Sequence, residues 1–318
     1  MNCLCCGKPL NGAQESQWHP ACIRSFFGTT VLPELDISEE TLTRIAAEST
    51  NKGYTVPGVQ KKMSLHLTTG GTPRLTLVNY PTGYILKPQT EAYRALPEAE
   101  YLVMQMARKT GISTVPFALI RIGEDIAYIT KRIDRVLPTR KQPNLQMRAM
   151  EDFCQLENRL TEDKYRGSYE RCAKIVTQYS ERAGLDLSEL FLRVVFSFVV
   201  GNSDMHLKNF SLIETAERSG RYVLSEAYDM LPVSCIIPND PEELALALNG
   251  KKRNIRRKDF LTFAEAAGLS KEGAEKMLRK VASMQEMYVT MCAESLIPDA
   301  MKERMTELIA ERVKIIEA

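Results

Sequence analysis

A short polar stretch that directly follows an apolar run combines residues able to handle a proton, a metal ion and phosphates. The segment VVGNSDMHLKNFSLI, residues 199–213, contains Asp204, His206, Lys208 and Asn209. An aspartate can accept a hydroxyl proton, and an amide oxygen nearby in the chain can bind a divalent cation. A surface loop can carry the same residues without a chemical role, so the rest of the chain must supply the other parts of such a site.

Three further features supply those parts. Asp229, in SEAYDML, would add a second hard oxygen ligand for Mg²⁺. Lys87 ends the strand-like segment YILKP, where its ammonium suits phosphate oxygens, although a lysine at a strand end is more often a solvated charge. Gly58 lies in the loop TVPGVQKK, where backbone amides could approach phosphates closely. Together with Asp204 and Asn209 they make up the set that phosphoryl transfer requires.

A second candidate metal site lies at the N-terminus. CLCC and WHPAC provide the pairs Cys3-x2-Cys6 and His19-x2-Cys22, with Cys5 as an alternative to Cys3. Two close pairs of soft ligands separated by a short loop can close a tetrahedral zinc site, which would be structural because no position is left open. A stretch of about thirty residues has too little apolar surface to fold alone, so a metal would stabilise it. The alternative is three exposed thiols and a core histidine.

The composition is that of an ordinary globular protein. Of its 318 residues 44% are hydrophobic and 26% are charged, and the formal net charge of +2 indicates neither strong nucleic-acid nor strong membrane affinity. No apolar run approaches the ~20 residues of a membrane span, and MNCLCCGKPL does not resemble a secretory signal. We therefore expect a cytoplasmic protein with reduced cysteines. Four scattered cysteines are predicted to be small buried hydrophobes: Cys154, Cys172, Cys235 and Cys292.

Hydrophobic periodicity predicts β-structure in the first part of the chain. After a short linking helix at 32–49, alternation predicts a three-stranded antiparallel meander in KMSLHLTT, RLTLV and YILKP. A helix begins near Pro97 and ends at Gly111. Two more strands, in VPFALIRI and DIAYITKRID, are joined by a turn at Gly123, and 137–147 is predicted to be a loop.

Helical periodicity dominates the remainder. The segments expected to be helical are LSELFLRVVFSFVV, 258–268, 271–294 and 298–317. The predicted fold class is therefore α+β, with a small β-rich N-terminal lobe, a larger helical C-terminal lobe and a ligand cleft between them. The predicted domains are a zinc-binding knuckle at 1–30, an N-terminal lobe at 31–135 and a C-terminal lobe at 136–318.

These residues carry a resemblance to a known family. From about residue 50 to 265 the chain resembles the HipA-type serine/threonine kinases of bacterial toxin–antitoxin modules. The most specific motifs are GNSDMHLKNFSL with AYDML, followed by MEDFCQ; the others are VPGVQKKMSL, YILKP, LPEAEYLVMQMARKTGI, ITKRIDR and LALNGKKRNI. The resemblance implies a protein-kinase-like fold. Only about fifty residues precede the glycine-containing loop, so the chain is similar to the short, HipT-like form that lacks an extra N-terminal subdomain.

The resemblance also implies roles for individual residues. It makes Asp204 the catalytic base, Asn209 and Asp229 the Mg²⁺ ligands, and Glu100 the partner that positions Lys87. The residues that it implies around ATP are Pro57, Gly58, Val59, Gln60, Lys61, Lys62, Lys87, Lys131, Arg132, Ile133, His206, Leu207, Lys208, Asn209, Tyr228 and Asp229.

Regulation and partners are further implications of the resemblance. Family members often autophosphorylate a serine just before the loop glycine; here Thr55 stands near that place, with Ser64 as the fallback acceptor. Two added negative charges there would repel ATP phosphates. The implied cofactors are ATP and Mg²⁺. The implied partners are a protein substrate, such as an aminoacyl-tRNA synthetase, a small antitoxin or separately encoded N-terminal subdomain, and a DNA-binding antitoxin.

Two other functions remain open from the sequence. A small-molecule phosphotransferase of the aminoglycoside type also uses an aspartate and an asparagine around a histidine, but it favours an acidic cleft, whereas basic loops occur here near 135–148 and 251–258. A catalytically silent HipA-like binding module would have lost the base, the lysine or the metal ligands, all of which are present. The basic segment KKRNIRRK, 251–258, could contact nucleic acid, but a solvated loop is the favoured interpretation.

Overall fold

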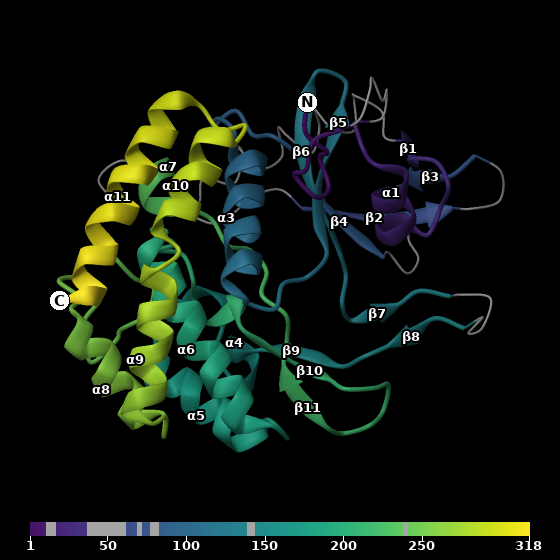
Figure 1. The fold of residues 1–318 in the computed structure, drawn as a ribbon. Helices are drawn as coiled ribbons and strands as arrows, with labels where there is room; N and C mark the ends of the chain where they lie inside the picture. Colours follow the sequence, from purple (N-terminus) through teal and green to yellow (C-terminus); the bar gives the residue numbers. More distant parts are fainter. Residues whose placement is uncertain (11–16, 37–61, 69–71, 77–82, 139–143, 238–240) are drawn as a thin grey trace. The chain divides into compact units, whose positions relative to one another are not determined.

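The computed structural model describes residues 1–10, 17–36, 62–68, 72–76, 83–138, 144–237 and 241–318 (Figure 1). The chain divides into two compact units. The first contains Met1–Tyr101 and Val115–Leu145, and the second contains Leu102–Thr114 and Gln146–Ala318. The predicted glycine-containing loop lies outside the described residues.

The first unit is built on a six-stranded sheet with the strand order β1-β3-β2-β4-β6-β5. The strands are β1 (Glu34–Asp36), β2 (Met63–Thr68), β3 (Arg74–Thr76), β4 (Tyr84–Lys87), β5 (Phe117–Ile122) and β6 (Asp125–Lys131). All neighbours are antiparallel except β1 and β3. The alternation that predicted β2 is visible in its burial, because Met63 and Leu65 are buried while Ser64 is exposed.

Two predictions for this region were wrong. The three strands do not form a meander, because β2 lies between β3 and β4 and pairs with both. Alternation within each strand cannot tell which neighbours a strand will choose, since that depends on long-range packing. The linking helix predicted at 32–49 is contradicted at its start, where Glu34–Asp36 form β1 and pair with β3; the remainder lies outside the described residues.

Two helices complete the first unit. α1 (Pro20–Phe27) begins with a proline in its first turn and ends at Gly28, whose left-handed backbone (φ 75°) closes the helix. α3 (Leu96–Thr110) ends before Gly111, as predicted, and the division of the chain into units falls within it, after Tyr101. A short strand, β7 (Arg135–Val136), follows the sheet.

The second unit is mainly helical. Its helices are α4 (Phe153–Leu156), α5 (Tyr169–Tyr179), α6 (Ala183–Val199), α7 (Val233–Ile236), α8 (Arg257–Ala266), α9 (Lys271–Ala282), α10 (Gln285–Glu294) and α11 (Asp299–Glu317), with 3-10 turns at Thr161–Asp163 and Leu207–Asn209. Its strands are β8 (Gln146–Met147), β9 (Met150–Asp152), β10 (Ser211–Glu214) and β11 (Tyr222–Leu224), of which the last three form an antiparallel sheet.

The apolar pattern of α6 produces the core of this unit. Nine hydrophobic residues of α6 from Leu187 to Val199 are buried. Phe191 contacts Phe263 of α8, and Phe198 contacts Phe260 of the same helix. The four scattered cysteines are all buried, as predicted. The single helix predicted at 271–294 is two helices, since α9 ends at Ala282 and α10 begins at Gln285, and the loop predicted at 137–147 ends in β8.

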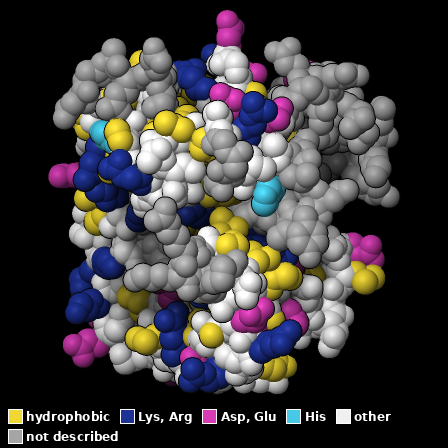
Figure 2. Space-filling model, turned by 90° about the vertical axis from the view of Figure 1, so that its right-hand side faces the viewer, with side chains coloured by type: hydrophobic (Ala, Val, Ile, Leu, Met, Phe, Trp, Pro, Cys, Tyr) yellow, Lys and Arg dark blue, Asp and Glu magenta, His cyan; other side chains and the backbone are white. Residues whose placement is uncertain are grey.

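The surface agrees with a net charge near zero. Figure 2 shows acidic and basic side chains on the same face. Within the described residues, no helix combines the length and the apolar character that crossing a membrane requires.

Candidate active site

Lys87 and Glu100 form a buried ion pair in the first unit. Lys87 ends β4, Glu100 lies in the second turn of α3, and Lys87 Nζ lies 2.6 Å from Glu100 Oε1. Both side chains are almost fully excluded from solvent, with 2% and 0% exposed, and the ammonium lies 5.2 Å from the centre of the Tyr128 ring. Removing both charges from water is costly, so such a pair persists only with close geometry. Its lysine is held at a defined point at the end of a strand.

In the second unit the polar stretch 202–209 begins where α6 is forced to stop. Gly201 has φ +70°, and a Cβ built there would lie 2.4 Å from Leu308 Cδ2 and 3.2 Å from Ser234 Cβ. Only glycine suits this backbone and this close approach. The chain then turns, with the Asn202 amide donating to the Ser197 carbonyl (2.8 Å). The end of a rigid, buried helix therefore fixes where the stretch starts.

Asp204 presents a partly exposed carboxylate. Its side chain is 16% exposed, the Tyr165 hydroxyl donates a short hydrogen bond to Oδ1, and His206 Nε2 lies 3.9 Å from the same oxygen. The Tyr165 and His206 rings meet edge to face at 5.0 Å. The Asp204 carboxylate therefore accepts a hydrogen bond from a hydroxyl group, as a general base would from an attacking alcohol.

Asn209 offers the oxygen that a hard cation requires. Its Nδ2 donates to the Asp204 carbonyl (3.0 Å), which leaves Oδ1 as the side-chain atom that can bind a cation. Its backbone amide donates to the His206 carbonyl (2.9 Å), so the short 3-10 turn holds the side chain in place. The donor set of an amide oxygen and the Asp229 carboxylate suits Mg²⁺.

Lys208 is fixed by Asp152, a residue whose role the sequence did not reveal. Lys208 Nζ lies 2.7 Å from Asp152 Oδ2. The other oxygen of Asp152 accepts from the Gln155 amide (2.8 Å), while Gln155 Oε1 accepts from the Asp152 amide (2.9 Å), so the two residues form a capping box at the start of α4. Both residues belong to the motif MEDFCQ, and the three-residue spacing of Asp152 and Gln155 could have indicated the capping box.

The segment that carries Asp229 is tethered to the polar stretch. The Tyr228 hydroxyl donates to the Lys208 carbonyl (3.2 Å) and lies 2.5 Å from Ser211 Oγ. Burial raises the pKa of Tyr228, so the phenol keeps its proton. Asp229 has a left-handed backbone (φ 55°), a conformation that aspartate tolerates better than most residues. Tyr228 therefore couples the positions of two predicted metal ligands.

Arg193 supports the same segment from α6. It is 1% exposed, donates to the Ser225 carbonyl (2.8 Å) and forms an ion pair with Glu189 (2.9 Å). Ser225 in turn donates its amide to the Ser211 carbonyl (2.9 Å). Spacing along α6 could have indicated the Glu189–Arg193 pair, but the contacts of Arg193 with Ser225 and of Tyr165 with Asp204 form only through the tertiary fold.

The other residues predicted around ATP differ in what the structure describes. Lys131 donates to the Ser25 carbonyl (3.3 Å), burial lowers its pKa, and Arg132 forms a bidentate pair with Asp134 (2.9 and 2.6 Å). Both side chains thus have partners within the first unit. Lys62 precedes β2, and Ser64 lies in that strand with an exposed side chain. Thr55 and the predicted phosphate loop, Pro57, Gly58, Val59, Gln60 and Lys61, lie outside the described residues.

The basic segment 251–258 is partly neutralised by nearby acceptors. Lys251 pairs with Asp259 (2.6 Å), and Lys252 pairs with Glu242 (3.2 Å). Arg257 donates to the Ile316 carbonyl (2.6 Å). This pairing favours the solvated-loop interpretation over a nucleic-acid contact.

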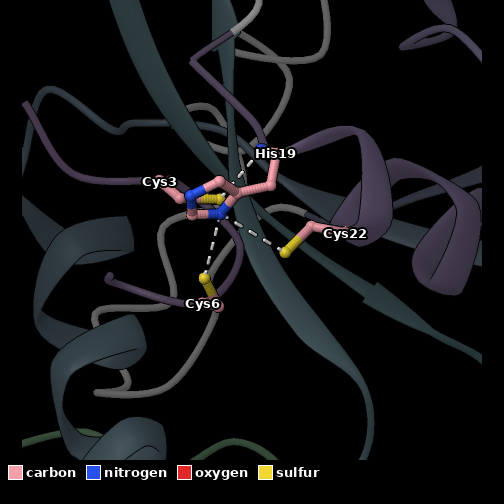
Figure 3. Close-up of side chains that lie close together, drawn as sticks. All are labelled: Cys3, Cys6, His19 and Cys22. Atoms are coloured by element: carbon pink, nitrogen blue, oxygen red, sulfur yellow. Dashed lines mark hydrogen bonds between the residues drawn. The ribbon is translucent and has the colours of Figure 1, made fainter. Parts of the chain in front are cut away.

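The N-terminal cluster is assembled as well. The metal-binding atoms of Cys3, Cys6, His19 and Cys22 all lie within 4.8 Å of one another (Figure 3). In the part of the chain that the structure describes, this is the one group of three or more His, Cys, Asp or Glu residues that could hold a metal ion.

Comparisons with known proteins identify the family. The sequence profile of the HipA-like C-terminal domain matches residues 54–288, which is most of the chain. The chain therefore belongs to the family of HipA-like C-terminal domains.

Curated relatives and solved structures agree with this assignment. A "Putative kinase" of Haemophilus influenzae is 24% identical over 84% of this chain and 82% of its own length, and "Putative kinase Y4dM" of Sinorhizobium fredii is 29% identical over 76% and 57%. HipA in the Shewanella oneidensis MR-1 complex with HipB and operator DNA superposes with a TM-score of 0.68, at 18% identity over 83% of this chain and 67% of that one.

The Helicobacter pylori proinflammatory kinase CtkA gives a TM-score of 0.53, at 19% identity over 76% of this chain and 87% of that one. These likenesses confirm the predicted α+β, kinase-like fold of the HipA type. The chain spans only 57% of Y4dM, so activities of the longer relative do not transfer directly.

Proposed function

We propose that this chain is an ATP- and Mg²⁺-dependent serine/threonine protein kinase of the HipA type. The observation that carries the proposal is the state of Asp204: a partly exposed carboxylate that already accepts a hydrogen bond from a hydroxyl, next to an asparagine whose amide oxygen is oriented by the Asp204 carbonyl. Phosphoryl transfer needs little more from the protein than positioning and charge stabilisation, and these residues supply both.

Each residue has a defined task in this proposal. Asp204 orients the attacking hydroxyl and accepts its proton, and Asn209 Oδ1 with the Asp229 carboxylate would hold Mg²⁺, which neutralises charge on the phosphates when bound. Lys87, positioned by Glu100, would bind phosphate oxygens. Lys208, held by Asp152, would add a second cation. The remaining predicted nucleotide contacts are proposed at the positions named from the sequence.

The surroundings of Asp204 favour a protein substrate over a cationic small molecule. Lys164 and Lys252 place their ammonium groups 5.0 and 6.0 Å from the centre of the Tyr165 ring, whose hydroxyl donates to Asp204. An aminoglycoside-type substrate carries several positive charges, and the nearby ammonium groups would repel it; Lys252 contributes less to this repulsion because it is paired with Glu242 (3.2 Å). The accepting serine or threonine is therefore proposed to lie in a segment without positive charge beside it.

The biological setting is proposed from the family. A HipA-type kinase would be the toxin of a toxin–antitoxin module, with a cellular protein such as an aminoacyl-tRNA synthetase as its target. The Shewanella neighbour is a complex with HipB and operator DNA. We propose a DNA-binding antitoxin and a small regulatory partner for this chain too, with Thr55 as the autophosphorylation site and Ser64 as the alternative.

Intact-protein mass spectrometry tests the proposal. The wild type, Asp204→Asn and the control Asp163→Asn are incubated with ATP and Mg²⁺, alone and with bacterial lysate, and the products are mapped. Asp163 is a suitable control because its carboxylate forms an ion pair with Arg166, whose side chain is 81% exposed. We expect transfer by the wild type and by Asp163→Asn, and none by Asp204→Asn.

Two results would contradict the proposal. Equal transfer by Asp204→Asn would remove Asp204 from the mechanism. ATP binding without transfer to itself or to any lysate protein would favour the catalytically silent binding module.

A further inference from the structure

We infer that the N-terminal cluster is a structural zinc site that clamps the β4 and α3 segments carrying Lys87 and Glu100. The ligands are Cys3, Cys6, His19 and Cys22, and the clamp is the polypeptide that they join, residues 1–10 and 17–28. The metal site itself is independent of the proposed kinase activity, whereas its effect on Lys87 rests on that proposal.

The distances from the His19 imidazole to two of the thiols are close to those of a tetrahedral zinc site, and all four ligand atoms lie within 4.8 Å of one another. Zinc binds sulfur at about 2.3 Å and imidazole nitrogen at about 2.0 Å, so tetrahedral ligand atoms lie roughly 3.5–3.8 Å apart. His19 Nδ1 lies 3.4 Å from Cys6 Sγ and 3.9 Å from Cys22 Sγ. In Figure 3 one nitrogen of the imidazole, Nδ1, faces both of these thiols, and the Cys3 thiol lies beside the ring. A soft donor set of three thiolates and one imidazole favours zinc over Mg²⁺ or Ca²⁺.

The surrounding hydrogen bonds prepare the ligands for a metal. His19 Nε2 lies 3.0 Å from the Pro9 carbonyl oxygen, which can only accept, so Nε2 carries the proton and Nδ1 faces the thiols with its lone pair. The His19 amide donates to Cys3 Sγ (3.4 Å). Cys3 is 1% exposed, so that ligand is sealed on the protein side.

A tight turn presents the first pair of ligands. The Gly7 amide donates to the Cys3 carbonyl (2.8 Å), the Cys3 amide donates to the Lys8 carbonyl (2.8 Å), and Gly7 has φ +73°. This backbone sets Cys3 and Cys6 on the same side of the turn. The second pair stands at the start of α1, where His19 is the N-cap and Cys22 lies in the first turn.

The clamp contacts the two elements that carry the ion pair. The Tyr101 hydroxyl, one residue after Glu100, donates to the Cys5 carbonyl inside the metal turn (3.2 Å). The Tyr84 hydroxyl, on β4 with Lys87, donates to the Phe26 carbonyl of α1 (3.3 Å), and its ring lies 5.4 Å from that of Phe27. Trp18 adds ring contacts with Phe26 and Phe27 at 5.6 and 5.5 Å.

The clamp also closes the edge of the sheet. β5 is an edge strand, and its Leu119 amide donates to the Leu4 carbonyl (2.9 Å), while Arg121 donates to Gln17 (2.9 Å). Leu4 lies between the ligands Cys3 and Cys6, and Gln17 lies two residues before the ligand His19. The Leu4 amide donates a hydrogen bond to the Gln17 carbonyl (3.0 Å). Without the metal, the turn that carries Cys3 and Cys6 would be joined to the start of α1 only by these hydrogen bonds and the aromatic contacts, so metal binding is expected to stabilise both segments.

The metal is tested on the full-length protein, independently of any activity. Purified wild type should contain one equivalent of zinc, and the chelated protein should bind cobalt(II) with the visible absorption of a tetrahedral thiolate site. Cys6→Ser and Cys22→Ser should lose the equivalent, whereas Cys5→Ser should retain it, because Cys5 contributes its carbonyl to Tyr101 and stands outside the ligand set.

Two outcomes overturn the metal site. One is wild-type protein that binds neither zinc nor cobalt(II) under reducing conditions. The other is a Cys5→Ser variant that loses zinc as completely as Cys6→Ser. The cobalt titration uses the wild type, so it decides the matter even if the ligand variants fail to fold.

The effect on Lys87 is tested by a double-mutant cycle. Cys22→Ser should raise the KM for ATP more than it lowers kcat, and this change should largely disappear in a Glu100→Gln background, because both substitutions act on one ion pair. Fully additive effects would overturn the clamp while leaving the zinc site intact. If the wild type binds zinc but neither the wild type nor Cys22→Ser transfers phosphate, the proposed function fails and the metal site stands.

Discussion

Two lysine–carboxylate pairs of nearly equal length occupy different surroundings in this protein. Lys87 and Glu100 lie 2.6 Å apart with 2% and 0% of their side chains exposed, between a strand and a helix. Lys208 and Asp152 lie 2.7 Å apart with 32% and 13% exposed, between a short turn and a helix cap. Distance alone therefore does not rank them. Burial ranks them, because a buried charge that loses its partner cannot be solvated by water.

The difference indicates how each lysine is kept in place. The buried lysine is held by an ion pair that water cannot replace and by regular secondary structure, so its position depends on a complete core. The half-exposed lysine is held by hydrogen bonds in a loop, where each bond adds little and water can replace it. Five variants test this contrast.

Glu100→Gln should have the largest effect. It removes the carboxylate charge that lies 2.6 Å from a buried ammonium, so we expect the free energy of unfolding to fall by about 3–5 kcal/mol, as when one partner of a buried pair is removed. Chemical denaturation measures this, and Glu98→Gln, in the same helix, is the matched control.

The double variant Lys87→Met/Glu100→Leu sharpens that result. Replacing both charges by apolar groups should recover most of the lost stability, whereas phosphoryl transfer should be absent because Lys87 is missing. A double variant as unstable as Glu100→Gln would show that the charge itself is not the cause.

Gly201→Ala should have the next largest effect, in the region of the exposed pair. Both the left-handed backbone and the 3.2 Å approach to Ser234 Cβ oppose a side chain, so we expect a loss of about 2–3 kcal/mol. Gly220→Ala is the control, because Gly220 has φ +64° but no atom within 4 Å of a built Cβ. Equal melting temperatures for the two variants would show that the close packing around Gly201 is unimportant.

Asp152→Asn should change stability by less than about 1 kcal/mol, because the pair is partly exposed and asparagine is also a good N-cap. Phosphoryl transfer should nevertheless fall, since Lys208 loses the anchor that positions it. Steady-state kinetics with thermal melting separates the two effects, and Glu151→Gln, which alters the exposed neighbouring carboxylate, is the control. A loss of stability as large as that of Glu100→Gln would show that the exposed and the buried ion pair do not differ in their contribution to stability.

Glu98→Gln should have the smallest effect, with the opposite sign. Burial, aided by Asp125, raises the pKa of Glu98 above its ordinary value of 4.5. The folded state then binds a proton more readily than the unfolded state, so the wild type loses stability as pH rises from the ordinary pKa through the raised one. The glutamine variant does not titrate, so it should gain less than about 1 kcal/mol at neutral pH and nothing at low pH. A gain that is independent of pH would contradict this explanation.

Much of the chemistry could be predicted without the tertiary structure. The stretch around Asp204, Lys87 at the end of a strand, and the two halves of the N-terminal cluster are local patterns, and local patterns are readable because spacing along the chain sets which atoms can meet. The structure indeed brings the four N-terminal ligands together and pairs Lys87 with Glu100.

The order of the strands was not predictable from such patterns. Alternating hydrophobic residues identified β2, β3 and β4, but not that β2 lies in the middle. Nor did the sequence indicate that residues 34–36 join the sheet as β1. Pairing is decided by the burial of whole faces and by loop closure, which no single segment encodes.

The sequence by itself determined the set of chemical groups and the elements that carry them, because residue type and periodicity act over a few positions. Only the tertiary structure decided the partners. Tyr165 contacts Asp204 across 39 positions of the chain, Lys208 contacts Asp152 across 56, and Tyr101 contacts the Cys5 carbonyl across 96. Such contacts form because packing of the apolar core brings distant segments together, and each polar group then needs a hydrogen-bonding partner where it has lost water.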